Sequence, residues 1–385
     1  MAGLKLPGPD GICDYVTGAP GDFGAPDVAF NRIALAAAHV VADPLADVDP
    51  WLEPAIDWDR TLAYRHHLWR HGFAVAEAMD TAQRGMGLGW TDALELIRRS
   101  VHEARSVPGA AVFSGVGTDH LAPSVDLGLD DIRAAYLEQL GAVQAIGGRV
   151  IVMASRALAA TAKGAEDYLK VYADVLAQAD EPVIIHWLGD MFDPALGGYW
   201  GSSDTGAAMD TCLAMLEANK TKIDGIKISL LSKQAEIEMR RRLPAGVQMY
   251  TGDDFNYAEL IEGDDQGFSH ALLGIFDAIA PAASAALKHL AAGDSDRFNQ
   301  ILAPTVPLSR HIFKAPTRFY KTGVVFLAWL NGHQDHFTMV GGQESTRSTL
   351  HLAELFRLAD RAGLFADPDF AARRMAAFLA LRGIG

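Results

Sequence analysis

Cysteine is scarce in this sequence of 385 residues. Only Cys13 and Cys212 are present, far apart in the chain, so neither a disulfide framework nor a thiolate metal site is indicated. Long hydrophobic runs are missing as well, because no stretch reaches about 18 uninterrupted apolar residues. The opening residues 1–9 lack the apolar run of a secretory signal. The sequence therefore predicts a soluble protein of the cytoplasm.

Positive charge is also in short supply. The formal net charge is −15, and a mean field of that sign repels both a nucleic-acid backbone and an anionic membrane. Neither is expected as a partner. A local arginine pair can still reverse the sign inside a pocket, so the net charge does not exclude an anionic small-molecule substrate. Half of the residues are apolar and a fifth are charged, which is ordinary for a globular protein.

Short apolar segments alternate with amphipathic helical segments through most of the chain. Each apolar segment ends in polar or glycine residues, and this alternation is typical of parallel strands joined by helices. Eight such units favour a closed (β/α)8 TIM barrel of class α/β over a doubly wound sheet. A doubly wound sheet would usually carry a glycine-rich loop after its first strand, and residues 39–43 contain none. The predicted strands lie within residues 33–41, 73–78, 110–113, 150–153, 182–185, 223–229, 247–250 and 267–270.

The alternation stops near Pro281. We divide the chain into an irregular arm over residues 1–30, the barrel over residues 31–281 and a C-terminal helical extension over residues 282–385. The extension contains the densest His/Asp cluster of the chain, Gly332 to His336. Its spacing matches no zinc motif, so we interpret it as a polar loop with satisfied histidines.

The segment Ile223-Asp224-Gly225-Ile226-Lys227-Ile228-Ser229 places a lysine between apolar residues at strand spacing. If the strand is buried on both faces, water cannot solvate the Lys227 ammonium group, and its pKa falls from about 10.4 toward about 7 or 8. The free amine can then add to a carbonyl group and form a Schiff base. The alternative is a lysine at a strand end that reaches solvent.

A family resemblance rests on four segments of the second half. These are Asp224-Gly225-Ile226-Lys227, Tyr250-Thr251-Gly252-Asp253-Asp254, Gly267-Phe268-Ser269-His270, and Ala280-Pro281 with its helix to Gly293. Together they resemble the dihydrodipicolinate synthase / N-acetylneuraminate lyase superfamily, whose members are class I lyases on a (β/α)8 barrel with a C-terminal helical extension. The resemblance implies that Lys227 is the Schiff-base lysine. A divergent branch, the DUF993 group, fits the sequence best.

The sequence departs from the superfamily pattern at the substrate carboxylate site and at the proton relay. Asp80-Thr81-Ala82-Gln83-Arg84 stands where the superfamily has a Gly-Thr-Thr-Gly-Glu loop, so only one threonine is kept. Ser155 and Arg156 replace its paired tyrosines, His186 replaces its proton-relaying tyrosine, and Met191 or one of its neighbours replaces a nearby arginine. Much of the superfamily's binding site for a keto acid is therefore missing, although Arg156 or Arg84 could bind the carboxylate of an acid from a different side of the pocket.

The barrel topology brings the polar strand ends to one mouth. The predicted catalytic residues are Lys227 and His186, since an imidazole of near-neutral pKa moves protons well. The polar side chains expected around them could form many hydrogen bonds, which suits a polyhydroxylated, sugar-like substrate. The predicted substrate-binding residues are Thr81, Gln83, Asp119, His120, Arg156, Asp253, Asp254, Ser269 and His270.

These residues predict a class I lyase, aldolase or dehydratase that needs no cofactor and acts on a keto acid or ketosugar-like carbonyl compound. The superfamily resemblance implies a homo-oligomer. Two alternatives remain open at this stage. One is a barrel that has lost catalysis and binds a sugar or a protein. The other is a metal-dependent sugar isomerase or lyase with His120, His186, Asp190, Asp253 and His270 as ligands.

Overall fold

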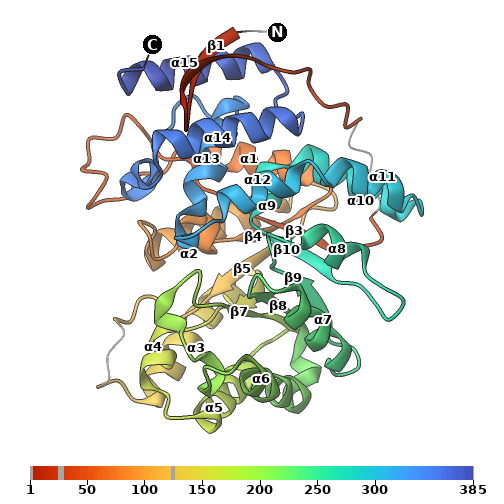
Figure 1. Cartoon of the computed structure of the whole chain (residues 1–385). Helices are drawn as coiled ribbons and strands as arrows, with labels where there is room; N and C mark the ends of the chain where they lie inside the picture. Colours follow the sequence, from red (N-terminus) through yellow and green to blue (C-terminus); the bar gives the residue numbers. More distant parts are fainter. Residues whose placement is uncertain (1–2, 25–29, 123–125, 385) are drawn as a thin grey trace.

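Eight parallel strands form a closed barrel, which confirms the predicted fold class. The computed structural model describes residues 3–24, 30–122 and 126–384. The strands follow one another around the barrel in the order β3-β4-β5-β6-β7-β8-β9-β10, and β10 pairs with β3 to close it (Figure 1). The strands are β3 (Ala34–Ala37), β4 (Ala74–Glu77), β5 (Val112–Val116), β6 (Arg149–Val152), β7 (Val183–Leu188), β8 (Ile223–Ser229), β9 (Gln248–Thr251) and β10 (His270–Leu273).

Side chains of alternating strand residues fill the barrel interior. Because successive residues of a strand point to opposite faces, each strand sends one set inward and the other toward the helices. The inward set forms its own buried cluster, separate from the larger core between strands and helices. Its members include Leu35, Ala37, Ala76, Phe113, Ile151, Ile184, Tyr250 and Leu272. The barrel is therefore packed below its mouth and open to chemistry only at the strand ends.

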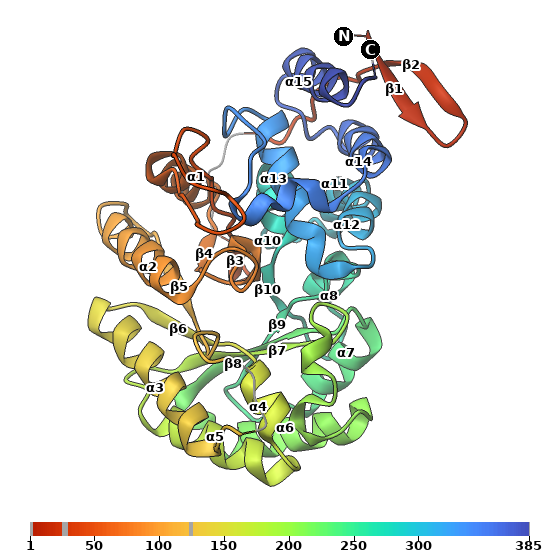
Figure 2. The ribbon, with the colours of Figure 1, turned by 90° about the vertical axis from the view of Figure 1, so that its left-hand side faces the viewer.

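The helices that follow the strands cover the outside of the barrel (Figure 2). Several begin at a side-chain cap: Ser155 and Ser232 each accept a hydrogen bond from a backbone N–H three residues later. Gly147 ends one helix in the left-handed conformation, which glycine adopts without a steric penalty. The helices are α1 (Trp58–Arg70), α2 (Trp90–Ala104), α3 (Leu129–Ile146), α4 (Arg156–Thr161), α5 (Ala165–Ala177), α6 (Thr205–Asn219), α7 (Lys233–Arg242) and α8 (Tyr257–Glu262).

The rest of the chain after β10 is helical, as expected. These helices lie together on one side of the barrel in both ribbon views (Figures 1 and 2). The chain then returns toward the barrel at the short 3-10 helix η5 (Thr317–Phe319). The helices are α9 (Ile275–Ala278), α10 (Ala280–Ala291), α11 (Ser295–Leu302), α12 (Thr305–Ile312), α13 (Tyr320–Leu330), α14 (Thr349–Arg361) and α15 (Pro368–Leu381). No helix in the described ranges is both long and apolar enough to span a membrane.

The N-terminal arm is partly regular, in contrast to the irregular arm expected for residues 1–30. Strands β1 (Gly3–Gly8) and β2 (Gly11–Val16) form an antiparallel hairpin. Its turn is Pro9-Asp10, and Gly11 has a φ of +118°, which favours glycine. Leu4 and Leu6 of β1 are buried, and the hairpin lies beside α14 and α15 (Figure 2). Glycine and proline thus mark a tight turn here.

Candidate functional site

Lys227 lies near the carboxyl end of β8, inside the barrel. Its residue is only 6% exposed, so the strand is buried on both faces and the lysine does not reach bulk solvent. Gly252, which follows β9, makes room for it: a Cβ at Gly252 would lie 2.7 Å from Lys227 Cε and 2.3 Å from Ser229 Oγ. The Lys227 side chain therefore passes over a position where a larger residue would collide.

Burial is the main influence on the Lys227 amine. Desolvation lowers its pKa below the ordinary 10.5, and the carboxyl groups of Asp80 and Asp254 oppose this without reversing it. Within the described residues, the amine makes no hydrogen bond or ion pair. A desolvated amine without a bound partner is the state that nucleophilic attack on a carbonyl requires.

His186 is the register partner of Lys227 on the neighbouring strand β7. Its Nε2 lies 3.1 Å from Ser229 Oγ, and its side chain is buried. Burial, followed by the charge of Lys227, lowers the pKa of His186 well below 6.5. The near-neutral pKa expected for a proton relay is therefore not found, and the imidazole is neutral at physiological pH. It can donate or accept a hydrogen bond but is a weak base.

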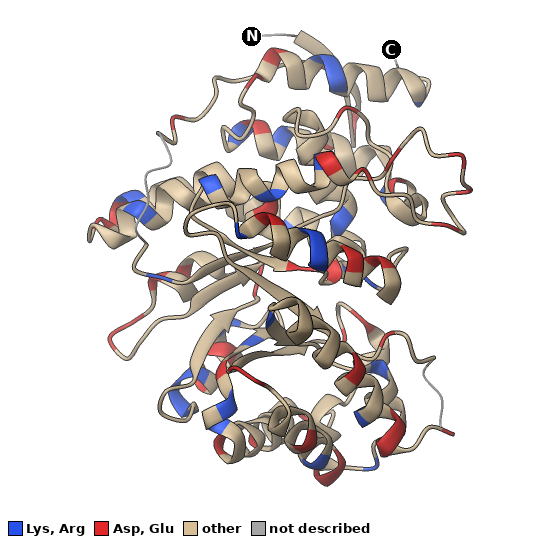
Figure 3. Ribbon diagram, turned by 180° about the vertical axis from the view of Figure 1, so that it is seen from behind, with Lys and Arg blue, Asp and Glu red and all other residues tan. Residues whose placement is uncertain are grey.

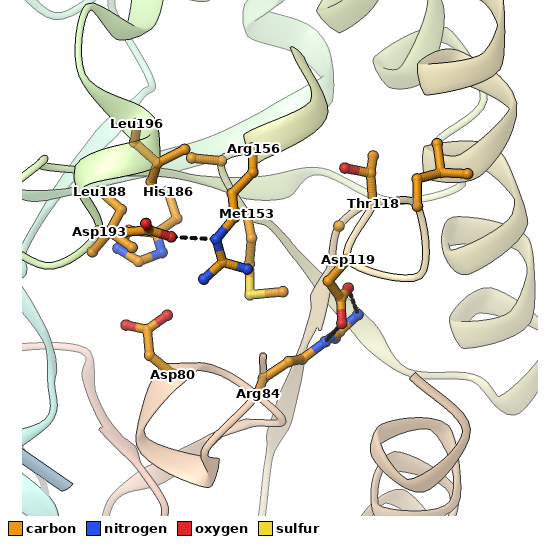
Figure 4. A pocket seen from close by; sticks show the side chains of 13 residues that line it. Asp80, Arg84, Thr118, Asp119, Met153, Arg156, His186, Leu188, Asp193 and Leu196 are labelled. Atoms are coloured by element: carbon orange, nitrogen blue, oxygen red, sulfur yellow. Dashed lines mark hydrogen bonds and ion pairs between the residues drawn. The ribbon is translucent and has the colours of Figure 1, made fainter. Parts of the chain in front are cut away.

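A cavity opens above His186 at the barrel mouth (Figure 4). It contains about 650 Å³ of empty space, part of it open to solvent. His186 lines the floor of this cavity, whereas Lys227, its neighbour on the adjacent strand, is not among the residues that line it. A second cavity shares several wall residues with the first and extends it toward η5 and α13. The shared residues are Asp80, Arg84, Arg156, Leu188 and Asp193.

Arg84 and Arg156 line opposite sides of this mouth (Figure 4), and Arg84 is held by several hydrogen-bond partners. Arg84 donates from Nε to Asp119 at 3.0 Å and from Nη1 to the Gly115 carbonyl oxygen at 2.6 Å, and its Nη2 donates to Asp119 and Gln139. Burial alone would raise the pKa of Asp119, but the hydrogen bonds and charge of Arg84 outweigh it and lower that pKa. The Arg84–Asp119 pair is thus a fixed part of the wall.

Thr81 and Gln83 come from the 3-10 turn η1 (Asp80–Ala82) and the residue after it. Thr81 Oγ1 lies 2.7 Å from the hydroxyl group of Tyr320, which lines the second cavity. Gln83 Nε2 instead donates to the Val340 carbonyl oxygen at 2.6 Å. Both residues therefore join this segment to the C-terminal extension, Thr81 through α13 and Gln83 through the later loop.

Asp253 and Asp254 differ sharply in what they contact. Asp253 accepts hydrogen bonds from the backbone N–H groups of Phe255 and Asn256, so it stabilises the turn after β9. Asp254 accepts one from the Ile275 N–H at 2.9 Å and lies near Lys227. Burial raises the pKa of Asp254 to about 7, against the lowering effects of the Ile275 N–H and of Lys227. Asp254 can therefore take up and release protons near neutral pH.

The structure does not bring Ser269 or His270 to the mouth. The eighth strand was expected at residues 267–270, but β10 begins at His270, so this residue lies at the amino end of the barrel. There its Nδ1 accepts a hydrogen bond from the Ile33 N–H at 2.9 Å. Ser269 donates to Glu236 Oε1 at 2.7 Å, outside the barrel. The substrate contacts predicted for both residues are wrong, because the strand begins three residues later than predicted and this moves them to the opposite end.

The ligand set of the metal-dependent alternative is not assembled. His270 lies at the far end of the barrel, Asp190 is exposed, and His120 contacts Gln139 through Nδ1 at 2.8 Å. Within the described ranges, no group of three or more His, Cys, Asp or Glu side chains is arranged to hold a metal ion. The histidines of the Gly332–His336 loop have local partners: His333 packs against His67 with ring centroids 4.3 Å apart, and His336 Nδ1 accepts a hydrogen bond from the Thr338 N–H.

Several residues of the mouth were not predicted to belong to it. Asp80 stands three residues after the end of β4, and Ser229 is the last residue of β8, so their place near strand ends was a usable signal. Tyr320 and Lys321 lie some forty residues beyond the barrel, and no local pattern marks them. They reach the mouth only because the extension folds back over it. The unpredicted residues include Asp80, Asp193, Ser229, Arg318, Tyr320 and Lys321.

The barrel with its helical extension is the fold of solved dihydrodipicolinate synthases. Dihydrodipicolinate synthase from Aquifex aeolicus has 13% sequence identity and a TM-score of 0.65, and the match covers 87% of this chain and 100% of that one. YagE, a prophage protein of the dihydrodipicolinic acid synthase family from E. coli K12 solved with pyruvate, has 14% identity and a TM-score of 0.65, with the same coverage. The enzyme from Bacillus clausii has 15% identity and a TM-score of 0.63, covering 85% and 96%.

Within that fold, the chain belongs to the family described as "Protein of unknown function (DUF993)", which matches residues 4–384. The predicted DUF993 membership is therefore confirmed. A search of curated proteins gave no significant match.

Proposed function

We propose that this protein is a class I lyase or aldolase whose Lys227 forms a Schiff base with the carbonyl group of a small substrate. The observation that carries the proposal is the Lys227 amine itself: it is buried, has a lowered pKa and contacts no acceptor among the described residues. The solved barrels of the same fold include one in complex with pyruvate, a carbonyl compound. A keto acid or a ketosugar is the substrate class that we propose.

The reaction needs one proton acceptor and one proton donor at the amine. Lys227 first loses a proton, and its nitrogen then adds to the carbonyl carbon to give a carbinolamine. Protonation of the hydroxyl group releases water and leaves the protonated imine, which accepts the electron pair of a neighbouring C–C bond as it breaks in a lyase reaction. In a dehydration it accepts the electron pair of a neighbouring C–H bond instead, and the resulting enamine then expels a protonated hydroxyl group as water. We assign the proton transfers to Asp254, because its pKa of about 7 suits both directions.

His186 has a different part in this proposal. Its low pKa keeps the imidazole neutral, so it orients the substrate oxygen or a water molecule at the cavity floor by a hydrogen bond. Ser229 holds the ring from the other strand. This replaces the proton relay that the sequence alone suggested for His186.

Trapping with borohydride tests the proposal. Pyruvate, dihydroxyacetone and glyceraldehyde are each incubated with the protein and reduced, and the intact mass and peptide map are recorded. We expect one reduced adduct on Lys227, absent in Lys227→Ala and Lys227→Arg. Equal adduct formation in wild type and Lys227→Ala, or no adduct with any probe, would contradict the proposal and favour a barrel that only binds ligands.

A further inference from the structure

Lys321 at the start of α13 is a buried cation without a counter-charge in contact. The residue is 3% exposed. Its Nζ donates to the Arg318 carbonyl oxygen at 3.3 Å and to Met86 Sδ at 3.1 Å. Both acceptors are uncharged, and no carboxylate of the described residues forms an ion pair with it. An ammonium group buried in this way is costly unless an anion joins it.

A second cation faces the same space. Arg156 uses Nε to donate to Asp193, while no hydrogen bond of its two Nη atoms is found within the described residues. Figure 4 shows the guanidinium group directed into the cavity between Met153 and Asp80. Gly85, with a φ of +71°, lies under it: a Cβ there would be 2.9 Å from Arg156 Nη1. The cavity wall is thus shaped to keep this group free.

The second cavity, called the outer cavity from here on, is lined by more positively than negatively charged side chains, although the net charge of the chain is negative. It is lined by four cations, Arg84, Arg156, Arg318 and Lys321, against two acids, Asp80 and Asp193, and Asp119 of the adjoining cavity pairs with Arg84, so positive groups still outnumber acids by one. The chain as a whole carries −15, and Figure 3 shows acidic and basic residues interspersed over the outer helices. A positive pocket on a negative protein concentrates anions locally.

We propose that Lys321 and Arg156, with Arg318 at the rim, form an anion subsite for the end of the substrate that is remote from the reacting carbonyl. The subsite is built jointly by the barrel and by the C-terminal extension. Its reference to a carbonyl rests on the proposed function, whereas anion binding itself does not. The ligand group is a phosphate or a carboxylate, since both accept hydrogen bonds from ammonium and guanidinium donors.

The two cavities fix the shape of such a substrate. The first cavity, which we call the inner cavity, reaches His186 beside Lys227, and the outer cavity reaches Lys321. Asp80, Arg156 and Leu188 line both, so one molecule can extend from one to the other. We therefore expect an elongated carbonyl compound with a terminal anion.

Binding of simple anions tests the subsite without any Schiff-base chemistry. Inorganic phosphate and malonate are titrated into the full-length protein by calorimetry at constant ionic strength. In Lys321→Met, which keeps the side-chain volume, we expect the tighter-binding anion to lose at least about tenfold in affinity. Arg318→Gln, at an exposed residue, should weaken binding less. Lys314→Met removes an exposed cation of the same extension outside both cavities and should change nothing.

The pH dependence gives a second readout. Burial lowers the pKa of Lys321 to about 8, with Asp80 and Asp193 acting against this and Arg156 and Arg318 adding to it. Anion binding should therefore weaken as the pH rises through about 8 in the wild type, and this step should be absent in Lys321→Met. Affinity unchanged in Lys321→Met, equal losses in Lys314→Met, or no binding of either anion would overturn the proposal.

Carbonyl probes then connect the subsite to the reaction. Borohydride trapping compares dihydroxyacetone phosphate and succinic semialdehyde with uncharged dihydroxyacetone. We expect at least about a tenfold preference for one anionic probe, which identifies phosphate or carboxylate, and loss of that preference in Lys321→Met. Lys227→Ala should abolish the adducts but retain anion binding. If the adduct forms on Lys227 without any anionic preference, the subsite fails while the proposed function stands.

Discussion

At the scale of single residues, Gly252 decides whether the Lys227 side chain can lie where it does. Gly252→Ala places a methyl group 2.3 Å from Ser229 Oγ and 2.6 Å from the Ile228 carbonyl oxygen. The backbone oxygen cannot move cheaply, so we expect a loss of about 1–3 kcal/mol in the free energy of unfolding. We also expect the Lys227 adduct to disappear. Gly141→Ala in α3, where a Cβ meets nothing within 4 Å, is the control for urea unfolding and for trapping.

The pKa of Lys227 should also depend on the charge of Asp254. The Asp254 carboxylate raises the pKa of Lys227, while burial lowers it more strongly. Asp254→Asn removes the raising influence, so the pKa of Lys227 falls further and the free amine persists at lower pH. The variant should therefore shift the rise of single-turnover imine formation with pH toward lower pH. A shift toward higher pH would show that Asp254 does not act on this lysine through its charge.

At the scale of the elements, the buried Glu236 joins α7 to β9 and to the segment before β10. Its carboxyl group accepts hydrogen bonds from Ser269 and Thr251. Burial raises its pKa from 4.5 to about 8. Above pH 4.5 the unfolded chain releases this proton while the folded protein retains it, so the Glu236 contribution to stability is full below that pH and is lost as the pH rises to about 8.

Urea unfolding at several pH values checks this. The wild type should lose stability from Glu236 with a slope of up to about 1.4 kcal/mol per pH unit in that window. Glu236→Gln, which keeps an acceptor for the two hydroxyl groups, should flatten the slope and be the more stable protein at pH 8. The prediction is wrong if both proteins show the same pH profile.

The elements also show how far sequence alone reaches. The strand at Lys227 and the helices of the extension were predicted, because apolar runs and helical periods are local signals. The eighth strand was placed three residues early, since Phe268 continues the apolar pattern although it precedes the first paired residue. That slip alone explains the wrong placement of His270. Lys321 could not be found, because its role depends on the extension folding back over the mouth.

At the scale of the whole molecule, the N-terminal hairpin lies away from the mouth and supports the extension instead. Tyr15 donates to Asp360 Oδ2 at 2.6 Å, and the Gly18 N–H donates to the same carboxylate. Deleting residues 1–16 exposes the surfaces of α14 and α15 and removes the Tyr15 hydrogen bond. We expect a lower Tm by calorimetry with unchanged trapping on Lys227 at 20 °C. Loss of the adduct at an unchanged Tm would show that the hairpin acts on the site.

The joint construction of the mouth has a consequence for biosynthesis. The amine to which we assign Schiff-base formation is residue 227, and the cation that we assign to its substrate is residue 321, nearly a hundred residues later in translation. A nascent chain that has just completed the barrel would hold the nucleophile without the group that selects its target. Selectivity toward cellular carbonyl compounds would then arise only when the last quarter of the polypeptide has left the ribosome and closed over the barrel.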